Sequence, residues 1–228
     1  MHKGKFITFE GSEGAGKSTQ LDLLATYIRD THKQEVVCLR EPGGTTISEE
    51  IRALFKDKVK AESMCAETEL LLLQASRAQL VRERLVPALN NGFTVICDRF
   101  FHSTLFYQGF GRGLDHDMIT ATTLFATNGL VPDLTIVLTL PLEQAMERIR
   151  IRSSLDRLEE EPKAFFERVQ QGVEWLATSQ SPKVLAVNGD QTVQKVHHDI
   201  VEGVDARLFP SVIYLPGTYA KKEIIKVG

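Results

Sequence analysis

The sequence has little of what marks several large classes of protein. No apolar run is long enough to span a bilayer, and the residues before Glu10 contain no apolar stretch of signal-peptide length. The formal net charge is −3, so there is no basic excess that would indicate binding to nucleic acid or to a membrane surface. We therefore expect a cytoplasmic protein whose partners are neither nucleic acids nor membranes.

Cysteine is also scarce. The sequence has three cysteines at wide spacing, no CxxC pair and no Cys/His cluster. This pattern argues against a disulfide framework and against a zinc site. Cys38 and Cys97 fall in apolar runs that contain β-branched residues, so we expect both to be small side chains of the core.

What the sequence does contain is a regular alternation of short apolar runs with helical periods. The predicted strands are Lys5–Glu10, Glu35–Leu39, Phe93–Asp98, Pro132–Leu140 and Lys183–Asn188. Helices are predicted at about Lys17–His32, Ile47–Lys56, Ala66–Asn90, Asp115–Thr127, Leu142–Arg152, Pro162–Thr178 and Thr192–Leu208. The glycine-rich segment Tyr107–Gly113 is expected to be an interruption before the helix that begins at about Asp115. Apolar strands separated by helices indicate an α/β fold with a parallel sheet covered on both faces. Ligands bind such sheets at the carboxyl ends of the strands.

The stretch from Gly11 to Thr19, GSEGAGKST, matches the phosphate-loop pattern GxxxxGK[ST] between a predicted strand and a predicted helix. Backbone N–H groups of such a loop surround phosphate oxygens, and the helix N-terminus adds its positive end. Lys17 is expected to reach the β- and γ-phosphates, and Ser18 to offer its hydroxyl to Mg²⁺. The predicted triphosphate site consists of Gly11, Ser12, Glu13, Gly14, Ala15, Gly16, Lys17, Ser18 and Thr19.

A phosphate loop alone does not distinguish a kinase from a switch GTPase or a motor ATPase. The sequence lacks the NKxD and DxxG patterns usual in a GTPase, which lowers that alternative without excluding it. Asp98 follows an apolar strand, as a Mg²⁺-holding acid does, and Arg99 comes directly after it. Arg52 and Arg77 add cations near the same rim, and Arg77 lies in an apolar helix where a buried charge needs an anion. This set favours a phosphoryl transferase with a monophosphate acceptor.

Six stretches, in this order, resemble the thymidylate kinase family of the bacterial type: FEGSEGAGKST, REPGGT, ASRAQLV, DRFFHSTLFYQGFGRG, PDLTIVL and RIRIRSSLDRLE. The resemblance spans Lys5 to Leu208. It implies the P-loop nucleoside monophosphate kinase fold, with a five-stranded parallel sheet, helices on both faces and a short lid. It implies transfer of the γ-phosphoryl of ATP to dTMP with Mg²⁺, in a homodimer. The kinase-like domain would cover residues 1–209, with the lid at about 148–160, and 210–228 would be a tail without a predicted structure.

The resemblance also implies roles for single residues. The implied dTMP site consists of Glu13, Pro42, Arg52, Leu73, Arg77, Arg99, Thr104, Tyr107 and Gln108. Arg77 and Arg99 would hold the acceptor phosphate with help from Arg52, while Thr104 and Gln108 would contact the thymine edge. Tyr107 would crowd a ribose 2′-hydroxyl, Glu13 would lie between donor and acceptor, and Pro42 would pack near the base. Arg148 and the loop at Asn188 would join the ATP site, and Ser18 and Asp98 would hold Mg²⁺, partly through water.

Four arginines in Met146–Pro162 fit either a solvated, salt-bridged helix face or a lid. Phosphoryl transfer needs cations from outside the phosphate loop, and this loop offers none before Lys17. The family places the missing arginine in the lid, so Arg152 is the first candidate and Arg157 the second. With Lys17, Glu13 and Arg99, these two arginines make up the predicted catalytic set.

The chain departs from the family pattern at Leu73, where a phenylalanine usually stacks on thymine. A leucine keeps apolar contact but loses stacking, and Phe101 and Phe106 are expected in the core. Two other hypotheses stay open: a kinase of the same fold for another pyrimidine, and a regulatory P-loop ATPase whose arginines bind a partner. By resemblance, the long helix Ala66–Asn90 is the expected dimer interface.

Overall fold

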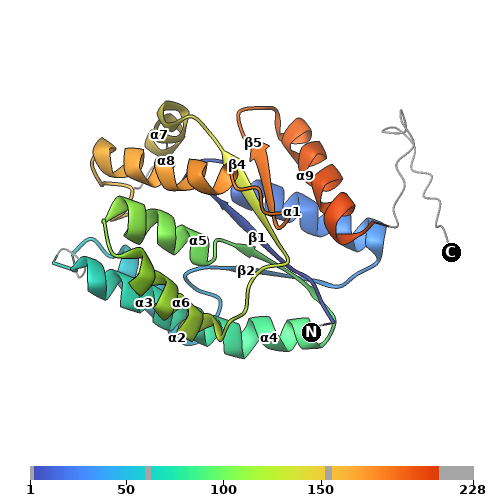
Figure 1. The fold of residues 1–228 in the computed structure, drawn as a ribbon, viewed down its shortest axis with the longest axis horizontal. Coiled ribbons are helices and arrows are strands. Elements are labelled where there is room, and N and C mark those ends of the chain that lie inside the picture. Colours follow the sequence, from blue (N-terminus) through green and yellow to red (C-terminus); the bar gives the residue numbers. More distant parts are fainter. Residues whose placement is uncertain (1–2, 60–62, 152–155, 211–228) are drawn as a thin grey trace.

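The fold is built around one parallel sheet. A computed structural model describes residues 3–59, 63–151 and 156–210, and its strands run side by side through the centre of the molecule (Figure 1). The strands are β1 (Phe6–Gly11), β2 (Val36–Arg40), β3 (Thr94–Asp98), β4 (Leu134–Thr139) and β5 (Val184–Asn188). Their order is β2-β3-β1-β4-β5 and every pairing is parallel. The predicted five-stranded parallel sheet is confirmed.

Helices connect the strands at nearly all the predicted positions. They are α1 (Lys17–Tyr27), η1 (Ile28–His32), α2 (Thr46–Lys56), α3 (Ala66–Leu80), η2 (Val81–Leu85), α4 (Val86–Asn90), α5 (Phe101–Thr104), η3 (Leu105–Gly111), α6 (His116–Thr127), α7 (Leu142–Arg150), α8 (Lys163–Ala177) and α9 (Val193–Leu208), where η marks a π-helical segment. Together α3, η2 and α4 form the long helix predicted for Ala66–Asn90. Within the described ranges, no helix has the length and apolar character needed to cross a membrane.

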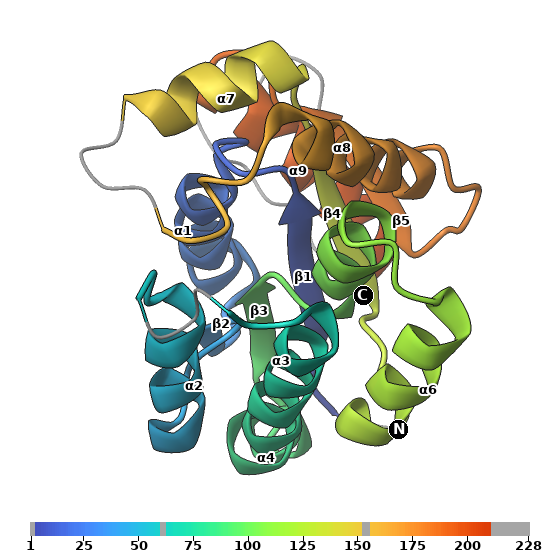
Figure 2. The ribbon, with the colours of Figure 1, turned by 90° about the vertical axis from the view of Figure 1, so that its left-hand side faces the viewer.

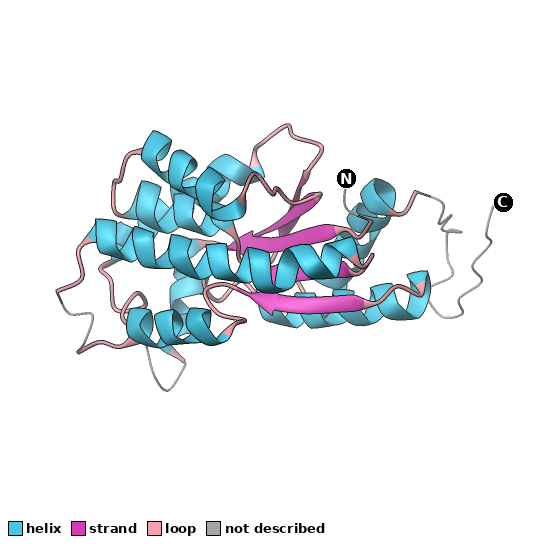
Figure 3. Cartoon of the chain, turned by 90° about the horizontal axis from the view of Figure 1, so that it is seen from below, coloured by secondary structure: helices cyan, strands magenta, loops and turns pink. Residues whose placement is uncertain are grey.

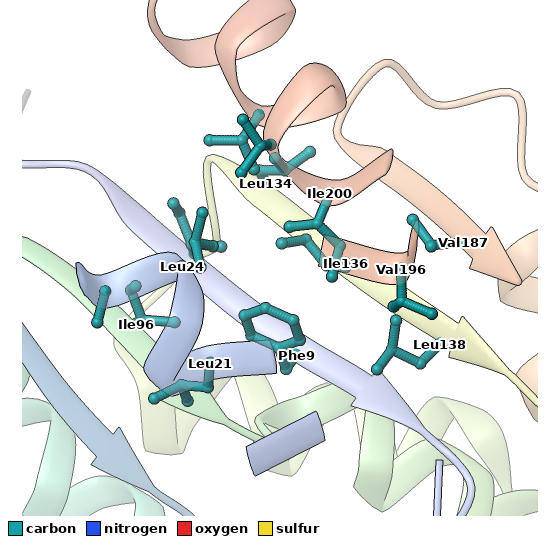
Figure 4. Packing of buried hydrophobic residues seen from close by; sticks show 14 of the residues in the cluster. Phe9, Leu21, Leu24, Ile96, Leu134, Ile136, Leu138, Val187, Val196 and Ile200 are labelled. Carbon is teal, nitrogen blue, oxygen red and sulfur yellow. The ribbon is translucent and has the colours of Figure 1, made fainter. Parts of the chain in front are cut away.

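Each face of the sheet carries its own hydrophobic core, and helices lie on both sides of the strands (Figure 3). On one face α1 and α9 pack over β1 and β4, around Phe9, Leu24 and Ile200 (Figure 4). On the other face α4 and α8 cover the strands, with Val95 and Val137 among the buried side chains. Because both faces are covered, the inner strands β1, β3 and β4 bury nearly every side chain instead of alternating between buried and exposed.

The carboxyl ends of the strands meet at one edge of the sheet. Gly11 ends β1 and pairs with Leu138 of β4, while Phe9 of β1 pairs with Asp98 at the end of β3. Figure 2 shows the arrowhead of β1 pointing toward the region beneath α7. The loops that carry the predicted phosphate and acceptor residues therefore gather at this edge.

One expectation about the core is wrong. Cys97 is fully buried in the inner strand β3, as predicted, but Cys38 is exposed. Cys38 lies in β2, which is an edge strand of the sheet. An apolar run does not reveal whether its strand will be central or at an edge, and only the central position guarantees burial.

The glycine-rich segment Tyr107–Gly113 does not interrupt the helix, because η3 continues through Gly111. Its glycines allow close packing: a Cβ atom at Gly111 would lie 2.6 Å from Cε2 of Phe165, and one at Gly109 would lie 3.0 Å from the His116 ring. These glycines permit α8 and α6 to approach, instead of turning the chain.

Candidate functional site

The phosphate loop leaves β1 at Gly11, where the backbone permits only glycine. Gly11 has φ +128°, and a Cβ atom there would lie 2.2 Å from the carbonyl oxygen of Leu138. Gly14 has φ +74° and passes close under α7, where a Cβ atom would lie 3.2 Å from the carbonyl oxygen of Ala145. Gly16 precedes α1 and caps it without any side-chain hydrogen bond in the described chain. The first N–H groups of α1 are thus available to an anion.

Lys17 is buried at the start of α1, and its side chain curls back over the loop. Its Nζ donates to the carbonyl oxygen of Ser12 at 2.7 Å and to that of Gly11 at 3.3 Å. Burial, helped by the nearby charge of Arg99, lowers the pKa of Lys17 to about 8. A triphosphate in the loop would supply the negative charge that this buried ammonium lacks.

Ser18, in the first turn of α1, meets Asp98 at the end of β3. The hydroxyl of Ser18 donates to Oδ2 of Asp98 at 2.7 Å. The other carboxylate oxygen, Oδ1, is buried and has no hydrogen-bond partner among the residues described. A carboxylate and a hydroxyl beside a phosphate loop are hard oxygen ligands of the kind that Mg²⁺ prefers, so this pair fits the ion.

Arg99 links the phosphate loop to the opposite end of the site. Its guanidinium pairs with Glu13 of the loop and lies 5.1 Å from the ring centre of Tyr107. Its Nη1 donates to the hydroxyl of Ser103 at 3.0 Å. Arg99 has φ +69°, a left-handed conformation that a non-glycine residue keeps only when its surroundings hold it there.

Glu10 fixes the backbone that follows Arg99, a role that the sequence analysis did not predict. This fully buried carboxylate accepts from the backbone N–H of Phe100 at 2.9 Å and from the hydroxyl of Ser103 at 2.6 Å. Burial raises the pKa of Glu10 to about 7, against the lowering effect of the Ser103 hydrogen bond and Arg99. An acid inside an otherwise apolar strand was the signal that could have identified it.

Arg77 is buried to 2% exposure in α3 and has a protein partner for its charge. It pairs with Glu41 at 2.7 Å and also donates to Oε1 of Gln74 and to the hydroxyl of Thr104. Burial raises the pKa of Glu41, which Arg77 opposes. The sequence argument required an anion near Arg77, and Glu41 meets that need. Contact between Arg77 and an acceptor phosphate stays a prediction.

A single cavity of about 460 Å³ brings the two ends together. From the phosphate loop, Glu13, Gly14, Gly16, Lys17, Ser18 and Thr19 line it. Every residue predicted for the dTMP site lines the same cavity. In the cavity wall, Arg52 donates to the carbonyl oxygen of Pro42 at 2.7 Å and so connects α2 to the loop after β2.

Other predicted ATP-site residues lie around the outside of the loop. Arg148 of α7 donates to the carbonyl oxygen of Gly14 at 3.0 Å. Asn188 ends β5 and is followed by Gly189, where a Cβ atom would lie 3.3 Å from the carbonyl oxygen of Ala15. The loop after β5 is therefore packed directly on the phosphate loop.

The predicted lid is only partly described. Arg152 and the Ser153–Ser154 junction lie outside the described residues, as does the tail beyond residue 210. Arg157 is described: its guanidinium pairs with Glu69 of α3 and stacks 5.1 Å from the ring centre of Phe55.

The chain that carries Arg157 is fixed to its surroundings by ion pairs that the sequence did not suggest. Asp156 pairs with Lys56 at 2.9 Å, and Glu160 pairs with Lys58, so two pairs tie this segment to the end of α2. Glu161 pairs at 2.6 Å with Arg112, which follows η3. Asp156 and Glu159 also line the cavity.

Leu73 lines the cavity where the family pattern has a phenylalanine. Phe106 is fully buried and Phe101 packs on a core cluster, which confirms that both belong to the core. The aromatic rings that line the cavity instead include Phe55 and Phe166. Neither ring could be assigned to the cavity from sequence, because Phe55 of α2 and Phe166 of α8 are far apart along the chain and meet only in the folded protein.

A phosphate loop and an arginine-rich second end share one cavity at the rim of a parallel sheet, which defines a nucleoside monophosphate kinase of the P-loop α/β class. The family model for thymidylate kinase matches residues 9–200. The chain is 42% identical to a thymidylate kinase of Kosmotoga olearia, with 86% of this chain and 93% of that protein covered. It is 45% identical to one of Pseudomonas putida, at the same coverage.

A solved structure gives the same result. The crystal structure of thymidylate kinase from Ehrlichia chaffeensis superposes with a TM-score of 0.70 at 30% identity, covering 89% of this chain and 98% of that one. The chain belongs to the thymidylate kinase family, whose reaction is the phosphorylation of dTMP to dTDP.

Proposed function

We propose that this protein transfers the γ-phosphoryl group of ATP to dTMP, giving dTDP and ADP in the synthesis of dTTP. The observation that carries this proposal is the single cavity lined by the phosphate loop at one end and by all of the predicted acceptor residues at the other. Direct transfer requires donor and acceptor in one enclosed space, where both are aligned and water is excluded.

At the donor end, the loop N–H groups and Lys17 bind the β- and γ-phosphates. Ser18 and Asp98 would hold Mg²⁺, which neutralises charge on the phosphates when it is bound. The orphaned Oδ1 of Asp98 supports this assignment. Arg148 and the loop that begins at Asn188 border the nucleoside of ATP.

At the acceptor end, Arg99 and Arg52 bind the dTMP phosphate, with Arg77 behind them. Glu13 already contacts Arg99, so it can orient the acceptor from the donor loop. Thr104 and Gln108 contact the thymine edge, Pro42 and Leu73 pack on the base, and Tyr107 lies against the sugar.

The transferring phosphoryl group needs one more cation, because its charge spreads over three oxygens in the transition state. Arg152 is the first candidate for this role and Arg157 the second. The partnership of Arg157 with Glu69 favours Arg152, since the guanidinium of Arg157 is already neutralised by a buried carboxylate.

The same proposal includes a homodimer and a cytoplasmic location. Large apolar side chains of α3 and α6 are exposed, among them Leu71 (60%), Met118 (61%) and Phe125 (82%), and the two helices pack together. An apolar face of this kind is typical of a subunit interface. The three free thiols are consistent with a reducing compartment.

The experiment that tests the function measures ADP release from Mg·ATP with dTMP, dUMP, UMP, CMP, AMP and GMP as acceptors. We expect strong preference for dTMP. Equal activity with ribonucleotides would contradict the role of Tyr107, and preference for another pyrimidine would identify the alternative kinase. ATP hydrolysis that needs no acceptor and is stimulated by a macromolecule would favour a regulatory ATPase.

A further inference from the structure

Glu69, near the start of α3, is a buried carboxylate with an unusual number of donors. It is 1% exposed. Its Oε1 accepts from Nε2 of Gln108 at 2.7 Å and from Nε of Arg112 at 3.2 Å. Its Oε2 accepts from Nη2 of Arg112 at 3.1 Å and from Nη2 of Arg157. Gln108, which is predicted to contact the base, and Arg157 of the predicted lid therefore bind the same carboxylate.

These donors keep Glu69 ionised. Burial works to raise the pKa of this carboxyl, but the hydrogen bonds from Arg112, Gln108 and Arg157 outweigh burial and hold the pKa below its usual value. An ionised carboxylate accepts hydrogen bonds and donates none. Only the NH₂ end of the Gln108 amide can therefore face Glu69, and the oxygen end must point elsewhere.

The oxygen end of Gln108 lacks a partner. Gln108 lines the cavity and is 1% exposed, and its Oε1 is buried without a hydrogen bond in the part of the chain that the structure describes. A buried acceptor of this kind is costly unless something donates to it. Its place in the wall of a ligand cavity indicates that the donor belongs to the ligand.

We propose that Glu69 is a positioning residue that fixes Gln108 as a hydrogen-bond acceptor toward the base, and so selects a pyrimidine that carries a hydrogen at N3. This inference rests on the proposed function and deepens it. Thymine and uracil have N3–H, whereas cytosine has a lone pair at N3. With Glu69 in place, a cytosine N3 would face the Gln108 oxygen and neither atom would have a hydrogen to share.

The test compares dTMP with 5-methyl-dCMP, which keeps the methyl group and changes only the N3 and 4-position chemistry. In Glu69→Gln, the new amide can donate to Gln108 as well as accept from it, so Gln108 is free to turn. We expect the ratio of kcat/KM for dTMP over 5-methyl-dCMP to fall by at least about tenfold, mostly through a higher KM for dTMP.

A charge-conserving exchange sharpens the test. In the double variant Glu69→Gln, Gln108→Glu, the amide at 69 donates to the carboxylate at 108, which again offers an acceptor to N3–H. We expect this double variant to recover the dTMP preference to within about fivefold of the wild type, whereas Gln108→Glu alone sets two carboxylates together and loses it. If Glu69→Gln alone does not fold, a higher preference for dTMP in the double variant than in Gln108→Glu still tests the role of Glu69.

Arg112→Lys is the matched control. It keeps a positive charge beside Glu69 and Glu161 but gives up the two-atom guanidinium contact with Glu69, and it leaves the bond from Gln108 to Glu69 intact. We expect its preference ratio to stay within about twofold of the wild type, since the orientation of Gln108 is kept. A folded Glu69→Gln with an unchanged ratio, or an equal loss in Arg112→Lys, would overturn the role of Glu69 while leaving the proposed function standing. A wild-type protein inactive with dTMP would overturn both.

Discussion

The proposed donor end and the proposed acceptor end of the cavity are built in different ways. The donor end is nearly continuous in sequence, since one loop between β1 and α1 supplies its backbone N–H groups, its lysine and its hydroxyl. The acceptor end is assembled from α2, α3, the chain after β3 and the segment that begins at Asp156. A contiguous site can be recognised from its motif, whereas an assembled one depends on the whole fold.

Two arginines of the acceptor end are also neutralised differently. Arg77 and Glu41 are almost completely buried, with side chains 3% and 4% exposed. Arg99 and Glu13 are partly accessible, at 17% and 27%. A buried pair contributes mainly by avoiding an unpaired charge, while a more exposed pair can exchange partners when a ligand arrives. The first pair is therefore structural in its main effect and the second is poised to contact ligands.

We expect the largest effect from removing the lid arginine, a cation that belongs to neither end of the cavity. We predict that Arg152→Ala lowers kcat by about 10³-fold or more while dTMP binding changes little, because the arginine would act only in the transition state. Steady-state kinetics with direct dTMP binding measure the two quantities separately.

Two variants serve as comparisons for Arg152→Ala. Arg150→Ala removes an exposed arginine at the end of α7 and should leave kcat within about threefold of the wild type. Arg157→Ala tests the second candidate. Near-normal turnover in Arg152→Ala with a large loss in Arg157→Ala would assign the catalytic role to Arg157.

The second prediction separates the two ion pairs by stability. Glu41→Gln leaves the Arg77 charge buried without an anionic partner, and we expect a loss of about 3 kcal/mol in the free energy of unfolding. Glu13→Gln affects a more accessible pair, so we expect less than about 1 kcal/mol there but a marked loss of turnover. Urea denaturation measures the first quantity.

The control for Glu41→Gln removes both charges. Glu41→Leu combined with Arg77→Met replaces the buried pair by apolar side chains, and stability should return toward that of the wild type. If Glu41→Gln is as stable as the wild type, the pair does not hold the acceptor end together.

The same contrast explains how much the sequence could predict. The sheet, most of the helices and the phosphate loop depend on local pattern and were predicted correctly, whereas the helical segment α5–η3 (Phe101–Gly111) was not. The predicted burial of Cys38 was wrong because the order of strands in a sheet is not a local property of the sequence. Glu10 and Glu69 were missed because each acts on residues far away along the chain, Phe100 in one case and Gln108 in the other.

The third prediction concerns the donor end alone. The pKa of Lys17 is about 8 without ligand, and bound phosphates would raise it, so ATP binding takes up a proton when the pH exceeds 8. ATP affinity should be constant below about pH 7 and fall about tenfold per pH unit above 8. Calorimetry in two buffers of different ionisation enthalpy measures the proton uptake.

Lys17→Arg is the control for this pH dependence, because a guanidinium keeps its charge throughout the range. Its ATP affinity should be weaker but independent of pH between about 7.5 and 9.5. A wild-type affinity that is equally flat would show that Lys17 keeps its proton despite burial.

The smallest expected effect lies at the acceptor end, where Leu73 replaces the family's phenylalanine. Leu73→Phe restores a ring beside the base, and we expect dTMP to bind about 2- to 10-fold more tightly, from about 0.5–1.5 kcal/mol of stacking, with ATP affinity unchanged. Leu73→Met is the matched control, since it conserves volume without a ring and should change dTMP affinity by less than about twofold. Calorimetric titration with dTMP distinguishes the two. If Leu73→Phe binds no more tightly, the rings of Phe55 and Phe166 that line the same cavity already supply the apolar contact that the base requires.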